Sequence, residues 1–330
     1  MTFELAAAPT TGAPTNANCG LLLPGLDGTN PLGFLAALGV FRVLANCRGA
    51  DSVHMKWSPS GGTWVPMINT GSVNTSDQDA ILDALCEGLA KGIDAHPAQL
   101  LDKLKNTGDD NPDRRSVFMD VLSQCDPSAA AGRAWTDWLA AVASDIAPAD
   151  AINQLQTARR DYYYENLASV IEKTTRDHLR RSLFQSWDYA DPLDNQSLHL
   201  DPSEDRRHAL QWNQPAGDPD RKKSGGMLGA NRLAIEAIPL FTSIPEGRTL
   251  RTIGFTGNRS TDTRWTWPIW SVGITLSVVR SLLLLPELQQ ESPKPAEIAA
   301  MQARGVVAVY RTYRILVGKT PNFTPARRIA

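Results

Sequence analysis

The stretch that decides the fold is GLLLPGLDGTNPLGFLAALGVFRVLANCRG, residues 20–49. It opens with a short apolar run, and Pro24-Gly25 and Asp27-Gly28 then indicate turns. A helix is predicted next, with Asn30 as its N-cap and Pro31 at its first position. The apolar residues of this helix surround its axis instead of forming one stripe, so we expect a central, buried helix.

Sheet elements are predicted on both sides of a helical middle. The alternating segments SVHMKW (52–57) and TWVPMI (63–68) indicate a hairpin or two neighbouring strands, and residues 77–189 are helical in pattern almost throughout, with helices over 97–106 and 148–175 among others. In the last third of the sequence, the residue pattern predicts helices over 231–238, 271–285 and 296–304. It predicts strands over 249–257, 264–270 and 306–318. The fold class is therefore α+β, with mixed sheet elements at both ends and a mainly helical middle.

Composition shifts divide the chain into four parts. We expect a flexible N-terminus over 1–18, an α+β region with the helical middle over 19–190, a polar loop or linker over 191–226, and a basic α+β region over 227–330. The two α+β regions could also form one continuous domain.

The N-terminal residues lack the basic start and apolar run of a signal peptide, and the four cysteines form no CxxC pair. The most apolar segment, 271–288, contains Arg280 and Pro286 and is too short to span a bilayer. We therefore predict a cytoplasmic protein without a membrane partner.

The formal charge is unevenly distributed along the chain. Residues 1–150 hold 9 Lys and Arg against 17 Asp and Glu, a charge of −8, and the remainder hold 24 against 18, a charge of +6. From Arg304 to the end there are six basic residues and no acid. An anionic partner should meet the C-terminal half, although a solvated basic surface gives the same pattern.

The segment KKSGGMLGANRLAIEAIPLF (222–241) places lysines and glycines before a helical pattern. A P-loop needs its lysine after the last glycine, and a dinucleotide fingerprint needs a preceding strand, so nucleotide binding is not indicated and we expect no cofactor. The candidate nucleic-acid contacts here are Lys222, Lys223, Gly229, Asn231 and Arg232. We expect Asn231 to brace the preceding polar loop, and leave open whether Arg232 does the same or faces nucleic acid.

A second candidate is TGNRSTDTRWTWPIW (256–270), where Asn258, Arg259 and Arg264 precede alternating Trp265 and Trp267. Arginines with aromatic side chains suit contact with the phosphate backbone and base stacking. Packing in an aromatic core is the favoured use of the tryptophans.

The segment HLDPSEDRRHALQW (199–212) contains candidate metal ligands. These are His199, Asp201, Asp205 and His208. In the alternative interpretation, which we favour, Asp201 or Ser203 caps a short helix while Arg206 and Arg207 pair with nearby acids. No histidine lies in a recognisable nucleophile context, so no catalytic residue is predicted.

Two parts of the sequence together resemble a known family. LPGLDGTNPLGFLAALGVFRVL (23–44), and LDPSEDRRHAL (200–210) followed by GANRLAIEAIPLF (229–241), are similar to the CRISPR-associated large-subunit-like proteins of type I-G (formerly I-U) loci, including a shorter group described as an extension of the helicase-nuclease. The resemblance covers about 60 residues and carries no catalytic signature.

The resemblance implies a non-catalytic subunit of an RNA-guided antiviral complex. Its partners would be other effector-complex subunits and guide RNA, target DNA or both. By matching position, the resemblance implies candidate site residues in the segment 201–207, including Arg206 and Arg207. It also implies Gly229, Asn231 and Arg232 as candidates. Two alternatives stay open, a structural adaptor that docks a helicase-nuclease or another subunit, and a metal-dependent hydrolase acting on nucleic acid or nucleotide.

Overall fold

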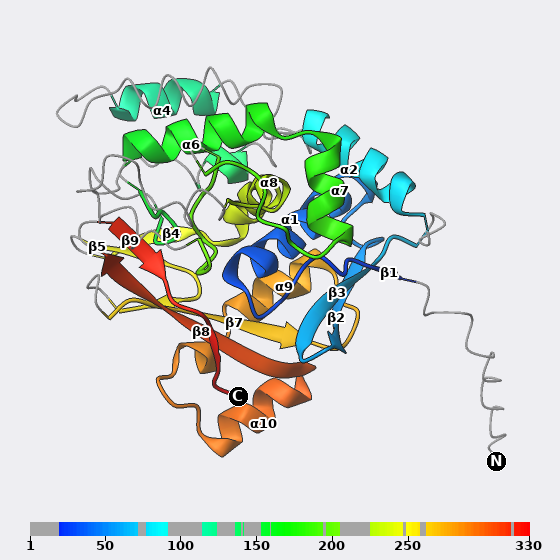
Figure 1. The fold of residues 1–330 in the computed structure, drawn as a ribbon. Helices are drawn as coiled ribbons and strands as arrows, with labels where there is room; N and C mark the ends of the chain where they lie inside the picture. Colours follow the sequence, from blue (N-terminus) through cyan, green and yellow to red (C-terminus); the bar gives the residue numbers. More distant parts are fainter. Residues whose placement is uncertain are drawn as a thin grey trace, which may run out of the picture.

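The structure, a computed structural model, combines helices with antiparallel sheets and is an α+β fold (Figure 1). It describes residues 20–71, 77–91, 114–123, 136–139, 141, 153–158, 160–193, 196–204, 225–246, 249–257, 262–317 and 320–330. The predicted flexible N-terminus (1–18) and the predicted helix over 97–106 lie outside these residues.

Two buried helices form the centre of the molecule. Helix α1 (Pro31–Arg48) starts as predicted, with the Asn30 side chain accepting hydrogen bonds from the backbone N–H groups of Leu32 and Gly33. Helix α8 (Leu228–Ala237) is buried along its whole length. The predictions of a central helix near the start and a helix after the glycine-rich segment are confirmed.

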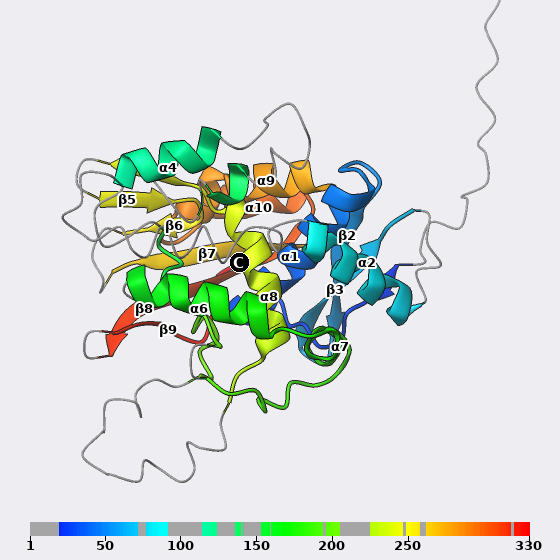
Figure 2. The ribbon, with the colours of Figure 1, turned by 90° about the horizontal axis from the view of Figure 1, so that it is seen from above.

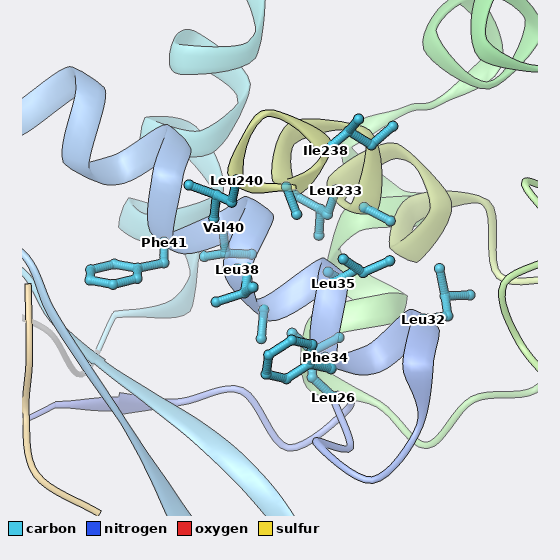
Figure 3. Packing of buried hydrophobic residues seen from close by; sticks show 14 of the residues in the cluster. Leu26, Leu32, Phe34, Leu35, Leu38, Val40, Phe41, Leu233, Ile238 and Leu240 are labelled. Atoms are coloured by element: carbon cyan, nitrogen blue, oxygen red, sulfur yellow. The ribbon is translucent and has the colours of Figure 1, made fainter. Parts of the chain in front are cut away.

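The two helices touch through a glycine. A Cβ atom at Gly39 of α1 would lie 1.8 Å from the backbone oxygen of Leu233 on α8, so only glycine permits this approach. Figure 3 shows Leu35 of α1 and Leu233 of α8 in the space between the helices. The apolar side chains that surround α1 are thereby buried on every side.

Two sheets pack on this helical centre. The smaller has the order β1-β3-β2, formed by β1 (Leu21–Leu22), β2 (His54–Ser60) and β3 (Thr63–Asn69). The larger has the order β10-β8-β7-β6 with β9 beside β8, and its strands are β6 (Phe255–Thr256), β7 (Arg264–Trp270), β8 (Val306–Val317), β9 (Thr320–Phe323) and β10 (Arg327–Arg328). A separate two-stranded ribbon consists of β4 (Ser243–Glu246) and β5 (Thr249–Thr252). The hairpin predicted near the start and the final strand are both confirmed.

Tryptophans join the two sheets to α1. Trp57 of β2 and Trp267 of β7 both stack on Phe34 of α1. The Trp267 indole N–H donates to the backbone oxygen of Gly28, and the Trp270 indole N–H donates to that of Met55. Trp265 and Trp267 are fully buried, so their favoured use in the core is confirmed.

The remaining helices surround the centre. Helices α6 (Arg160–Lys173) and α7 (Arg176–Phe184) lie beside α8, and α2 (Gln78–Lys91) contacts α1 (Figures 1 and 2). Helix α9 (Leu276–Leu283) packs near α1 and β7, while α10 (Pro295–Ala303) lies on the other side of the large sheet (Figure 1). The described helices also include α4 (Arg114–Ser123) and two short 3-10 helices, η4 (Ile238–Leu240) and η5 (Pro286–Gln289).

The helix predicted over 148–175 is wrong for residues 153–158, which form turns before α6 begins. Asn153 accepts a hydrogen bond from the backbone N–H of Leu155 and donates to the backbone oxygen of Phe241. The Thr157 hydroxyl donates to the backbone oxygen of Leu198. These long-range hydrogen bonds hold the segment outside a helix although its apolar spacing is helical.

One hydrophobic core runs through the described residues, from Leu21 to Phe323, and includes residues of both predicted α+β regions. Helix α1 is the only described helix long and apolar enough to cross a membrane, and most of it is buried in this core. Helix α9, predicted over 271–285, spans only eight residues.

Candidate nucleic-acid interface

Three arginines and a tyrosine share the face of the large sheet that points away from α1. Arg264 on β7 lies directly opposite Tyr313 on β8. Arg311, two residues before Tyr313, lies directly opposite Arg327 on β10. Opposed residues of antiparallel strands project to the same side, as do residues two apart on one strand. We call Arg264, Arg311, Tyr313 and Arg327 the arginine-tyrosine face.

The alternate residues of the same strands point into the core, which fixes the direction of this face. Trp265 lies opposite Thr312, and Trp267 lies opposite Tyr310, with which it stacks. All four side chains are buried. The large aromatic side chains therefore pack between the sheet and α1, and the arginine side chains project from the opposite side of the sheet.

The three arginines differ in how far their charge is committed to other groups. Arg311 is buried and donates to the Thr266 hydroxyl and to the backbone oxygens of Gln290 and Glu291. Burial lowers its pKa. Arg264 forms an ion pair of 2.9 Å with Glu291. Arg327 is exposed and makes no ion pair within the described part of the chain.

An accessible aromatic ring lies among these charges. Tyr313 is 40% exposed, and Ile315, two residues further along the same side of β8, is 37% exposed. Guanidinium groups suit phosphate oxygens, and an exposed ring offers a base a surface on which to stack. The arrangement can bind an anionic polymer that also presents flat aromatic groups.

The sequence-based candidates Gly229, Asn231 and Arg232 are instead buried in α8, so their prediction as nucleic-acid contacts is wrong. A Cβ atom at Gly229 would lie 2.2 Å from the backbone oxygen of His178, so this glycine lets α7 approach α8. Asn231 accepts a hydrogen bond from the backbone N–H of Leu198 at 2.8 Å and donates to the backbone oxygen of Met227 at 3.0 Å. The expectation that Asn231 braces the preceding polar segment is confirmed.

Arg232 belongs to a buried charge cluster between α1 and α8. Its guanidinium lies 2.8 Å from one carboxylate oxygen of Glu236, and Arg42 of α1 lies 3.1 Å from the other. Desolvation lowers the pKa of Arg42, and the charge of Glu236 opposes that shift. The question left open for Arg232 is thus answered in favour of the core.

The metal candidates His199 and Asp201 lie in a hydrogen-bonded turn. One carboxylate oxygen of Asp201 accepts from the backbone N–H and the hydroxyl of Ser203, and the other accepts from the Tyr189 hydroxyl. Within the described residues no group of three or more His, Cys, Asp or Glu side chains is arranged to hold a metal. Asp201 therefore caps a turn, whereas the alternative interpretation predicted a cap of a short helix, and residues 201–204 form no helix. Asp205 and His208 lie outside the described residues.

Beside this turn is a buried carboxyl that the sequence did not single out. The Ser197 hydroxyl donates to one oxygen of Glu204, and His199 Nδ1 lies 3.5 Å from that oxygen. Burial raises the pKa of Glu204 to about 8, with a further contribution from the charge of Asp201. Glu204 is consequently a neutral acid at pH 7.

Six further sequence-based candidates lie outside the described residues, namely Arg206, Arg207, Lys222, Lys223, Asn258 and Arg259. Their assignment as nucleic-acid contacts stays a prediction. Of the two predicted basic residues that the structure describes, Arg264 lies on the arginine-tyrosine face and Arg232 does not.

Sequence reasoning missed Arg311, Tyr313 and Arg327 as individual site residues. The basic, acid-free stretch from Arg304 onward did point to this part of the chain. The alternation in YRTYR also separates Arg311 and Tyr313 from Tyr310 and Thr312, but the sequence does not show which strands lie beside β8.

Comparison with known proteins gives no assignment. No protein-family model matches the sequence, and no curated protein is similar enough to it to count as a match.

Proposed function

We propose that the chain is a non-catalytic nucleic-acid-binding protein that holds its ligand on the arginine-tyrosine face. The observation that carries this proposal is the strand register, which places Arg264 opposite Tyr313 and Arg311 opposite Arg327 on one side of the sheet. Arg264 lies beside the exposed Tyr313, Arg327 lies opposite Arg311, and the exposed Ile315 side chain follows Tyr313 on the same side of β8. A sheet that combines cations with an aromatic ring is an established mode of nucleic-acid recognition.

The narrower proposal is a subunit of an RNA-guided antiviral complex of type I-G, acting in the cytoplasm with other effector subunits and with guide RNA or target DNA. It rests on the resemblance of residues 23–44, 200–210 and 229–241 to the large-subunit-like proteins. The charge of +6 over residues 151–330 is compatible with it, because the large sheet belongs to that half of the chain.

A metal-dependent hydrolase has less support. Both carboxylate oxygens of Asp201 are engaged by Ser203 and Tyr189, and the part of the chain that the structure describes contains no metal-ligand group.

The test is binding of the full chain to fluorescently labelled oligonucleotides of mixed sequence, single-stranded and duplex, followed by anisotropy at several KCl concentrations. We expect binding at low salt, and the logarithm of the affinity should fall with the logarithm of the salt concentration by about 0.7 to 0.9 for each phosphate contacted. Arg327→Ala should weaken binding about threefold to tenfold and make that slope shallower.

Arg280→Ala is the control, because Arg280 is an exposed arginine on α9, a helix that packs near α1, where it forms an ion pair of 3.1 Å with Asp137. It should leave binding within about twofold. The proposal is abandoned if no oligonucleotide binds at low salt, or if Arg280→Ala and Arg327→Ala weaken binding equally.

A further inference from the structure

The arginine-tyrosine face has few uncommitted charges but an accessible aromatic ring, that of Tyr313. Arg311 is occupied by three oxygen acceptors, and Arg264 is paired with Glu291, whose side chain is 77% exposed. Arg327 is the exposed arginine of this face without an ion pair among the described residues. Tyr313 and Ile315 by contrast project side by side along β8 and are both accessible.

A duplex would use this surface poorly. Its outer surface consists of phosphates and sugars, and the flat faces of its bases are stacked inside. Binding would then depend on Arg327 and on a partly neutralised Arg264, while Tyr313 and Ile315 would gain no partner. Duplex binding by so few cations is weak and easily screened by salt.

An unpaired strand would use all of the surface. A splayed base can stack on the Tyr313 ring, where it also covers Ile315, while the phosphates flanking that base lie within reach of Arg264 and Arg327. The opposed position of Arg264 and Tyr313 puts a cation next to the stacking ring, as this contact requires.

We propose that the arginine-tyrosine face selects single-stranded nucleic acid by stacking one unpaired base on Tyr313. This inference rests on the proposed nucleic-acid-binding function and names the form of the ligand. The phosphate-and-base chemistry is shared by DNA and RNA, so both are tested.

The experiment compares four labelled ligands of equal length and matched sequence, which are single-stranded DNA, single-stranded RNA, and the two corresponding duplexes. We expect the native chain to bind at least one single-stranded ligand about tenfold or more tightly than the duplexes. Tyr313→Leu should weaken that binding about tenfold and leave duplex binding within about twofold, and Tyr313→Phe should retain the preference because the ring is kept.

Tyr162→Leu is the matched control, because Tyr162 is also exposed, at 52%, and belongs to α6, a helix on the opposite side of the large sheet from α10 (Figure 1). It should keep the single-strand preference. Equal affinity for duplex and single strand, or an unchanged preference in Tyr313→Leu, would overturn this inference and leave the proposed function standing. Absence of binding to all four ligands would overturn both. Thermal unfolding of each variant establishes that a lost preference does not come from a lost fold.

Discussion

Arg264 and Glu291 form an ion pair of 2.9 Å at the rim of the arginine-tyrosine face. The Glu291 carboxylate competes with any phosphate that approaches Arg264. Glu291→Gln removes this competition and should raise affinity for nucleic acid by about twofold to fivefold, because an exposed ion pair contributes up to about 1 kcal/mol. The same anisotropy titration measures the effect.

A general gain in positive charge would also raise affinity, so the control must carry the same change elsewhere. Asp83→Asn on α2 removes an exposed carboxylate that forms an ion pair of 2.8 Å with Arg176. It should change affinity less than Glu291→Gln does. An equal increase in the two variants would mean that net charge, and not the face, determines binding.

The contact of Gly39 with Leu233 makes a strong prediction about stability. A Cβ atom at Gly39 would overlap the backbone oxygen of Leu233, and backbone atoms inside two packed helices cannot move aside cheaply. Gly39→Ala should therefore lower the free energy of unfolding by about 3 kcal/mol or more, measured by urea denaturation.

Gly273→Ala serves as the comparison. Its Cβ atom would lie 3.7 Å from the Cβ atom of His54, which is an ordinary contact, and it should change the free energy of unfolding by less than about 1 kcal/mol. A similar small effect of Gly39→Ala would contradict the close helix packing.

The fold was predictable where local pattern and burial agree. Apolar residues on all sides of 31–45 allow only a central position, and Asn30-Pro31 fixes where that helix begins. Residues 153–158 show the limit, since their turns depend on Phe241, Leu198 and Thr252, which are distant in sequence. A helical pattern cannot reveal partners supplied by the tertiary fold.

The candidate site was less predictable than the fold. The sequence pattern placed Arg232 at the start of a helix, where its side chain could face either solvent or the core. In the structure it faces the core, because Glu236, which also contacts Arg42, lies there. The arginine-tyrosine face depends on the register of β7, β8 and β10, which is a long-range property. The excess of basic residues near the C-terminus and the candidate Arg264 pointed to it in advance.

The buried cluster of Arg42, Glu236 and Arg232 supplies a further prediction. Glu236→Gln removes the carboxylate that both guanidinium groups contact and should lower the free energy of unfolding by about 3 to 5 kcal/mol. Replacing all three by apolar residues of similar volume should recover most of that loss, because the cost of desolvating the charges disappears as well. Urea denaturation of both variants measures this, and a change below about 1 kcal/mol for Glu236→Gln would contradict it.

The buried carboxyl of Glu204 predicts an unusual dependence of stability on pH. Burial raises its pKa from 4.5 to about 8, so between these values the folded chain holds a proton that the unfolded chain has lost. The contribution of this group to stability is therefore complete below about pH 4.5 and is lost as the pH rises to about 8. Glu204→Gln keeps a neutral side chain at every pH and should raise the free energy of unfolding at pH 8 by about 4 kcal/mol, with little change at pH 4.5. Glu172→Gln, which removes an exposed carboxyl on α6, should leave the pH dependence as it is in the native chain. Urea denaturation at pH 4.5, 6 and 8 decides the matter, because a Glu204→Gln variant whose stability still falls across this range would show that other groups cause the loss.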